Sequence, residues 1–158
     1  MSQRIGDLLV AAGVLDRAGL QQAVAEREQH RGQLGRCIVE LGLVGEETYV
    51  RALSAQLQLP AVSLDPAHIA ASVVRTVPLK TCERYGLVPF RLDAKRKLLD
   101  VAMADASNNE AIDAIEEMTR FKVRPFVAGP GAVDRVLEMH GGNGADYMKM
   151  SVMKDPAQ

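Results

Sequence analysis

The side chains best suited to chemistry are scattered along the 158 residues of the chain. His30, His68 and His140 lie far apart and lack the close spacing that metal ligands usually show. Cys37 and Cys82 stand alone, without a CxxC pair. Two reduced, buried thiols are therefore the favoured interpretation, over a disulfide or a shared metal.

Other patterns that carry catalysis are also missing from the sequence. It contains no GxxxxGK[ST] phosphate loop and no GxSxG motif, and the glycines of "AGPGAVDR" predict a turn and a helix start. Glu116 and Glu117 are adjacent, so they point to different sides of a helix. Asp105 follows a predicted strand, where α/β proteins often bind ligands, but a loop or capping role is favoured. We expect neither an enzyme nor a cofactor.

The composition bounds the class of protein. Apolar residues make up 47% of the chain, enough to bury a core, and the charged residues nearly cancel at a net charge of −1. A nucleic-acid binder would more often carry a dense basic stripe. No run of about 18 apolar residues predicts a membrane span, and the N-terminus lacks the pattern of a signal peptide. We therefore expect a cytoplasmic protein without membrane insertion.

One sequence pattern typical of a short amphipathic helix occurs twice. "RIGDLLVAAGVL" begins at Arg4, and "QLGRCIVELGLV" begins at Gln33, 29 positions later. Apolar positions and glycines coincide at this offset, which indicates an internal duplication of a helix–turn–helix unit. The matched pairs include Ile5 with Leu34, Gly6 with Gly35, Leu9 with Ile38, Gly13 with Gly42, and Val24 with Leu53.

These units need further elements around them. Gly13 and Gly42 predict helix ends, Asp16 predicts a helix cap, and Pro60 ends the fourth helix. Beyond it, the pattern predicts an edge strand at 61–64, helices near 70–74 and 79–85, strands at 86–93 and 97–105, a helix at 107–121 capped by Asn108 or Asn109, a strand at 122–128 and a helix at 129–141.

The predicted fold class is therefore α+β, in two parts. A duplicated helical hairpin subdomain occupies residues 1–58, and a small α/β sheet subdomain follows over residues 60–140. Residues 141–158 lack a sustained apolar face, and we predict a disordered tail.

The duplication resembles the MshEN form of the N-terminal domain of type II secretion and type IV pilus assembly ATPases. That family repeats a 24-residue motif after a five-residue spacer, and each motif begins Arg-Leu-Gly and ends in Gln. Here the motifs are residues 4–27 and 33–56, the spacer is "EQHRG", and residues 60–140 resemble the rest of the domain. The resemblance implies a regulatory module with a protein partner in a secretion, pilus or motility assembly, without the ATPase motor.

The resemblance also implies a ligand, the bacterial second messenger cyclic di-GMP. Arginine can fork onto a phosphate or a guanine edge, glutamine amides can pair with base edges, and apolar side chains can floor a purine site. Glycines allow close backbone approach. The candidate ligand-binding residues are Arg4, Ile5, Gly6, Asp7, Leu9, Gly13, Leu20, Val24, Arg27, Gln33, Leu34, Gly35, Arg36, Ile38, Gly42, Leu53 and Gln56.

Two departures from the family pattern leave alternatives open. Arg27 stands where the first motif should end in Gln, and Gln33 stands where the second should begin with Arg. Asp7 can accept a hydrogen bond from guanine, whereas its counterpart Arg36 cannot. The exchange either preserves nucleotide binding or leaves a degenerate protein-docking domain. A DNA-binding helix–turn–helix is disfavoured, because segment 46–57 offers only one arginine among its acids.

Overall fold

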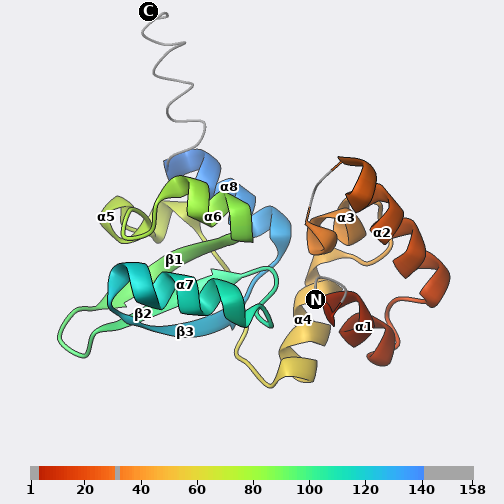
Figure 1. Cartoon of the computed structure of the whole chain (residues 1–158), viewed down its shortest axis with the longest axis horizontal. Helices are drawn as coiled ribbons and strands as arrows, with labels where there is room; N and C mark the ends of the chain where they lie inside the picture. The colour runs from red at the N-terminus through yellow and green to blue at the C-terminus, as the bar shows by residue number, and fades with distance from the viewer. Residues whose placement is uncertain (1–3, 31–32, 141–158) are drawn as a thin grey trace, which may run out of the picture.

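The structure is a computed structural model that describes residues 4–30 and 33–140. Figure 1 shows a sheet-containing part beside a group of helices from the start of the chain. The elements in chain order are α1 (Arg4–Ala11), α2 (Arg17–His30), α3 (Leu34–Glu40), α4 (Glu46–Leu57), a 3-10 turn (Pro66–His68), α5 (Ala71–Val74), α6 (Leu79–Tyr85), β1 (Leu87–Asp93), β2 (Leu98–Met103), α7 (Asn109–Thr119), β3 (Lys122–Val127) and α8 (Pro130–His140).

Helices α1 to α4 form two hairpins with the same local geometry. Gly13 and Gly42 both have positive φ, +80° and +76°, which glycine adopts without the strain of a side chain. The amide of Val14 then donates to the carbonyl of Leu9, and its counterpart Leu43 donates to Ile38. In the first hairpin, Asp16 Oδ1 accepts from the Gly19 amide at 2.7 Å, which caps α2. The predicted duplication therefore holds at the level of individual hydrogen bonds.

A close contact between helices is also duplicated. A Cβ on Gly6 would collide with the Leu20 side chain, and a Cβ on Gly35 would collide with the Tyr49 hydroxyl. Leu20 and Tyr49 are themselves 29 positions apart. Each hairpin thus uses a glycine on its first helix to admit a large side chain from its second helix.

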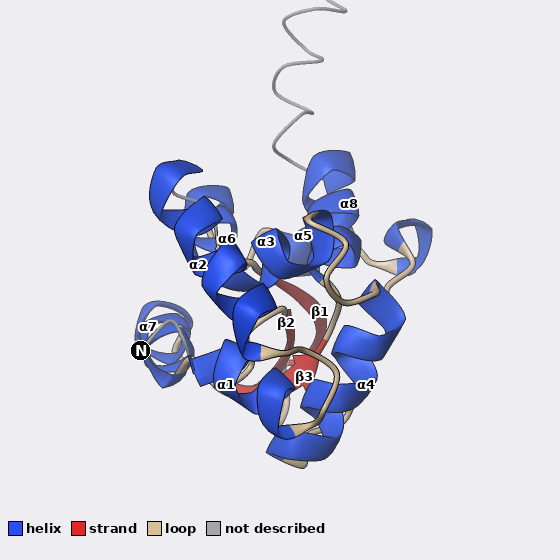
Figure 2. Ribbon diagram, turned by 90° about the vertical axis from the view of Figure 1, so that its right-hand side faces the viewer, coloured by secondary structure: helices blue, strands red, loops and turns tan. Residues whose placement is uncertain are grey.

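The described residues of the second part form a three-stranded sheet in the order β1-β2-β3. β1 and β2 pair antiparallel, with a bulge between Pro89 and Arg91, and β3 pairs parallel to β2. The parallel connection runs through α7, which is capped as predicted: Asn108 Oδ1 accepts from the Ala111 amide at 3.1 Å. This arrangement confirms the predicted α+β class. Figure 2 looks onto the hairpins with the strands behind them.

Asp100, in the middle strand, is a buried polar residue, with 1% of its surface exposed. The Nε atoms of Arg91 on β1 and Arg124 on β3 each lie 2.6 Å from its carboxylate. The guanidinium groups lie at the surface and compensate the buried charge from both neighbouring strands. Hydrogen bonding to Asp100 raises the pKa of Arg124.

The structure corrects one predicted element, and one predicted segment lies outside the described residues. Segment 61–64 was predicted as an edge strand, but in the described chain it makes only one parallel bridge, Ala61 with Val127. The chain leaves the sheet soon afterwards, because the Asp65 carboxylate accepts from the Ala67 amide and turns it. The predicted tail, 141–158, lies outside the described residues, and the subdomain boundaries stay a prediction.

Both cysteines are free and buried, as predicted. Burial raises the pKa of Cys82 to about 12, so this thiol stays protonated. Within the described ranges, no helix combines the length and the apolar character needed to cross a membrane.

Candidate ligand-binding site between the subdomains

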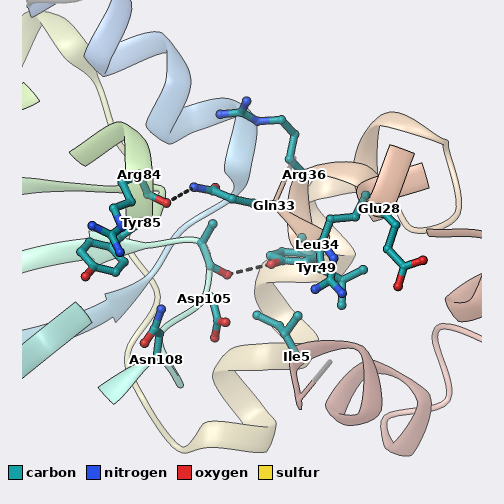
Figure 3. Close-up of a pocket in the computed structure, with 13 residues that line it drawn as sticks. Ile5, Glu28, Gln33, Leu34, Arg36, Tyr49, Arg84, Tyr85, Asp105 and Asn108 are labelled. Carbon is teal, nitrogen blue, oxygen red and sulfur yellow. Dashed lines mark hydrogen bonds between the residues drawn. The ribbon is translucent and has the colours of Figure 1, made fainter. Parts of the chain in front are cut away.

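A pocket of about 430 Å³ lies where the hairpins meet the sheet subdomain. Figure 3 shows its two sides: side chains from α1 to α4 face those from the end of α6 and from the loop after β2. Its lining consists of Ile5, Arg27, Glu28, Gln33, Leu34, Gly35, Arg36, Tyr49, Arg84, Tyr85, Ala104, Asp105 and Asn108. Its volume falls within the range of small-molecule sites.

Tyr49 joins the two sides at the back of the pocket. Its hydroxyl donates to the carbonyl oxygen of Ala104 at 2.7 Å, and the side chain is fully buried. Burial raises the pKa of Tyr49 well above its ordinary value, and the nearby charges of Asp105 and Glu46 add to this effect. The hydroxyl therefore stays protonated and remains a donor.

Gln33 closes the pocket on the α6 side. Its Nε2 donates to the carbonyls of Glu83, at 3.0 Å, and Arg84, at 2.8 Å, which lie at the C-terminal end of α6. Figure 3 marks the bond to Arg84. These carbonyls have no partner within the helix, so the amide satisfies groups that would otherwise need water. Gly86 ends α6 at a φ of +66°, and a Cβ there would collide with the Gln33 amide.

Arg36 crosses from α3 to α8. Its Nη2 lies 2.5 Å from Asp134 Oδ1, but its Nε is buried and has no hydrogen-bond partner among the described residues. Burial raises the pKa of Asp134 above its usual range, and the charge of Arg36 opposes that rise only in part. A buried guanidinium nitrogen without an acceptor is costly.

Charges of both signs line the rest of the pocket. Arg27 makes no hydrogen bond or ion pair with another described residue, and the Arg84 guanidinium lies over the Tyr85 ring, 5.3 Å from its centroid. Asp105 Oδ1 accepts from the amide and the hydroxyl of Ser107, at 3.0 and 2.5 Å. Asp105 Oδ2 has no such bond in the described chain, so it can accept from a ligand.

The structure divides the residues predicted from the sequence into several groups. Six line the pocket: Ile5, Arg27, Gln33, Leu34, Gly35 and Arg36. Asp7, Leu20 and Val24 line a second hollow of about 430 Å³ between α1 and α2. Within the described residues, Arg4, Gly13, Gly42 and Gln56 are exposed outside both linings, whereas Leu9, Ile38 and Leu53 are core residues and Gly6 packs on Leu20.

Several lining residues were missed by the sequence analysis. Tyr49 is a core residue, but its hydroxyl also reaches Ala104. Asp105 follows a strand and supports its own loop, as the favoured interpretation predicts, and it also lines the pocket. Arg84 and Tyr85 gave no signal, because they reach the pocket only through the packing of α6 against the hairpins.

Comparison with known proteins identifies the domain. The sequence profile of the MshEN domain matches residues 57–146, more than half of the chain. The chain belongs to the MshEN domain family. The profile match begins at the end of α4, so the two repeats precede it.

The most similar curated relatives include much larger proteins that contain an MshEN-like part. Type IV pilus assembly ATPase PilB of Myxococcus xanthus (strain DK1622) is 27% identical over 140 residues, which cover 89% of this chain and 24% of that protein. PilB of Thermus thermophilus is 25% identical over 138 residues, which cover 87% of this chain and 16% of that protein. The MshEN chain thus spans a quarter or less of these relatives.

Solved structures confirm the fold over the hairpins as well. The N-terminal domain of XpsE has a TM-score of 0.65 and 25% identity, and the match covers 89% of this chain and 95% of that domain. A structure of MshE with cdg has a TM-score of 0.60 and 24% identity, with 87% of this chain and 99% of that chain covered. Matches of this extent include most of the helical subdomain.

Proposed function

We propose that this MshEN domain is a non-catalytic regulatory module of a pilus or secretion assembly, and that its pocket between the subdomains binds cyclic di-GMP. Its similarity to part of PilB, a pilus assembly ATPase, supports the assembly. The structure of MshE with cdg supports the ligand class.

The observation that carries the proposal is the Arg27 guanidinium in the lining of the pocket. It makes no hydrogen bond or ion pair with another described residue, whereas Arg36 is already paired with Asp134. Phosphate oxygens suit guanidinium groups, because they accept charge-assisted hydrogen bonds. We assign one phosphate of the ligand to Arg27.

The other lining residues suit a guanine base. Asp105 Oδ2 can accept from guanine N1–H or the amino group, the role for which the sequence offered Asp7 and for which Arg36 was unsuited. The Tyr85 ring and the apolar surface of Leu34 can face the purine.

The exchange of Arg27 and Gln33 relative to the family pattern is compatible with nucleotide binding in this proposal. Arg27 and Gln33 end one motif and begin the next, and both line this pocket. An exchange between two residues of one pocket keeps one arginine and one glutamine there. Arg4 and Gln56, at the outer ends of the motifs, are exposed outside this pocket, so the proposal assigns them no contact with the ligand.

Isothermal titration with cyclic di-GMP tests the proposal. A micromolar site holds about 8 kcal/mol in total, and one charged hydrogen bond contributes about 1.5–3 kcal/mol. Arg27→Ala should therefore weaken binding roughly ten- to a hundredfold. Arg75→Ala, an exposed arginine outside the pocket, is the matched control and should bind like the natural protein.

If cyclic di-GMP produces neither heat nor a thermal shift at high micromolar concentration, while circular dichroism shows an intact fold, the proposal of a nucleotide ligand is wrong. The second candidate, a docking domain with no nucleotide ligand, would then replace it. The similarity to part of PilB, a pilus assembly ATPase, supports that candidate as well, because it points to a protein assembly.

A further inference from the structure

The second repeat shows how one hairpin of this kind docks another structure. Arg36 pairs with Asp134 on α8, and Tyr49 donates to Ala104 after β2. Glu46 Oε2 accepts from the amide of Ala132 at 2.9 Å, in the first turn of α8. These three side chains form one docking face on α3 and α4, which lie beside the sheet subdomain in Figure 1.

Two of these three contacts reach the N-terminal part of a helix, α8. The first amides of α8 have no partner within the helix, so the Glu46 carboxylate satisfies one of them, that of Ala132, and benefits from the helix dipole. The glycines on either side of Pro130 make room for it, because a Cβ on Gly129 or Gly131 would collide with Glu46. Asp134, an acid near the same end, completes the pattern by pairing with Arg36.

The first repeat carries the same three positions with the charges inverted. At the offset of 29, Asp7 replaces Arg36, Arg17 replaces Glu46, and Leu20 replaces Tyr49. Figure 1 places α1 and α2 on the side of the hairpins that is farther from the sheet. Asp7 and Arg17 are exposed there, and neither forms an ion pair with a described residue.

A hollow already exists at this face. It has a volume of about 430 Å³, and its lining includes Asp7, Arg17, Leu20 and Val24. The buried Leu20 and the half-buried Val24 supply its apolar lining. Glu28 also lines the hollow, so carboxylates outnumber the arginine and make it unsuited to a phosphate group.

We infer that this face docks the C-terminal end of a helix from a partner protein, with a lysine or arginine in the last turns of that helix. The second repeat contacts the N-terminal part of a helix. Because the first repeat carries the opposite charges at the same positions, we expect it to fit the C-terminal end of a helix. Arg17 would donate to the last carbonyls, which have no partner within the partner's helix. Asp7 would pair with the basic side chain, which helix C-termini favour. This inference does not rest on the nucleotide proposal.

Two short peptides, bridged by lactams so that they stay helical and blocked at both ends, provide the probes. One carries Lys in its last turn, the other carries Asp in its first turn, and both share the same apolar side chains. Binding is followed by shifts of the backbone amide NMR signals of residues 7–28. The Lys peptide should shift these signals and bind at least about tenfold more tightly than the Asp peptide.

The double variant Asp7→Arg with Arg17→Glu restores the charges of the second repeat, and it should reverse the preference between the peptides. A matched control, Asp113→Arg with Arg75→Glu, moves the same charges at exposed sites on α7 and after α5, and should keep the natural preference. Equal binding of both peptides, no binding of either, or no reversal in the folded double variant would each overturn the inference.

Discussion

The two repeats have nearly the same backbone, yet their outward side chains have very different surroundings. Both keep the glycine that admits a large side chain and the glycine that ends the first helix. The second repeat directs Gln33, Arg36, Glu46 and Tyr49 into contacts with the sheet subdomain. The difference shows that the duplicated helical framework stays constant, while the exposed polar positions decide what each copy holds.

The largest expected effect concerns Tyr49. Tyr49→Ala should lower the free energy of unfolding by about 3–5 kcal/mol, as other buried aromatic truncations do. The variant also leaves the Ala104 carbonyl without its donor. Leu20→Ala, the same position in the first repeat, should cost less, because Leu20 is a smaller side chain without a hydrogen bond. Urea unfolding of both variants measures the comparison, and equal losses would contradict it.

The matched glycines should respond unequally to alanine. Gly35→Ala should cost about 1–3 kcal/mol by overpacking, because the hydrogen bond to Ala104 fixes the Tyr49 hydroxyl that the new Cβ would meet. In Gly6→Ala the new Cβ meets the end of the Leu20 side chain, which can rotate away. Alanine also favours the helix by up to about 1 kcal/mol, so Gly6→Ala should be close to neutral. Thermal unfolding of the two variants tests this, and a greater loss for Gly6→Ala would refute it.

A smaller effect is expected at the first position of each motif. Gln33→Ala removes two hydrogen bonds to α6, which lie near the surface and should contribute about 1 kcal/mol together. Arg4→Ala removes an exposed side chain and should change stability by less than about 0.5 kcal/mol. Hydrogen exchange of the α6 amides offers a local measurement. Unchanged protection in Gln33→Ala would show that these two hydrogen bonds do not stabilise the end of α6.

The smallest effect depends on pH. Burial raises the pKa of Asp134 in the folded state, so the folded protein holds this proton more tightly than the unfolded chain. Its contribution to stability is therefore fully present below the ordinary pKa of an aspartate, and it is lost as the pH rises through the folded pKa. Relative to Asp134→Asn, the natural protein should gain stability as the pH falls from 7 toward 4.

Urea midpoints of both proteins across that range would show this trend. Asp7→Asn, at the position of the first repeat that matches Arg36, controls for general acid effects on an exposed carboxylate. If the natural protein instead gained stability relative to Asp134→Asn as the pH rises, the charge of Arg36, and not burial, would dominate at Asp134.

Local chemistry explains how much of the fold could be predicted. The helix ends at Gly13 and Gly42, the cap at Asn108 and the hairpin of β1 and β2 all depend on neighbours within a few residues. The prediction of an edge strand at 61–64 failed because the pairing of this segment depends on β3, more than 60 residues away in sequence, and on the turn at Asp65.

The candidate site was harder to predict for the same reason. The sequence placed Arg27, Gln33 and Arg36 at one ligand, and the structure brings them to one pocket. It gave no sign of Arg84 or Tyr85, because those residues reach the pocket only when Gln33 binds the end of α6, 50 residues away. No local pattern of charge or hydropathy records such a contact between two separately formed subdomains.

Asp100 also limits the ways in which the sheet can assemble. Side chains alternate between the faces of a strand, so a slip of β2 by one residue would turn Asp100 away from Arg91 and Arg124 and bury an unpaired carboxylate in the opposite apolar layer. The same slip would bring an apolar side chain between the two arginines. A purely apolar middle strand would tolerate misaligned neighbours far better, so this one carboxylate penalises wrong strand registers while the sheet is forming.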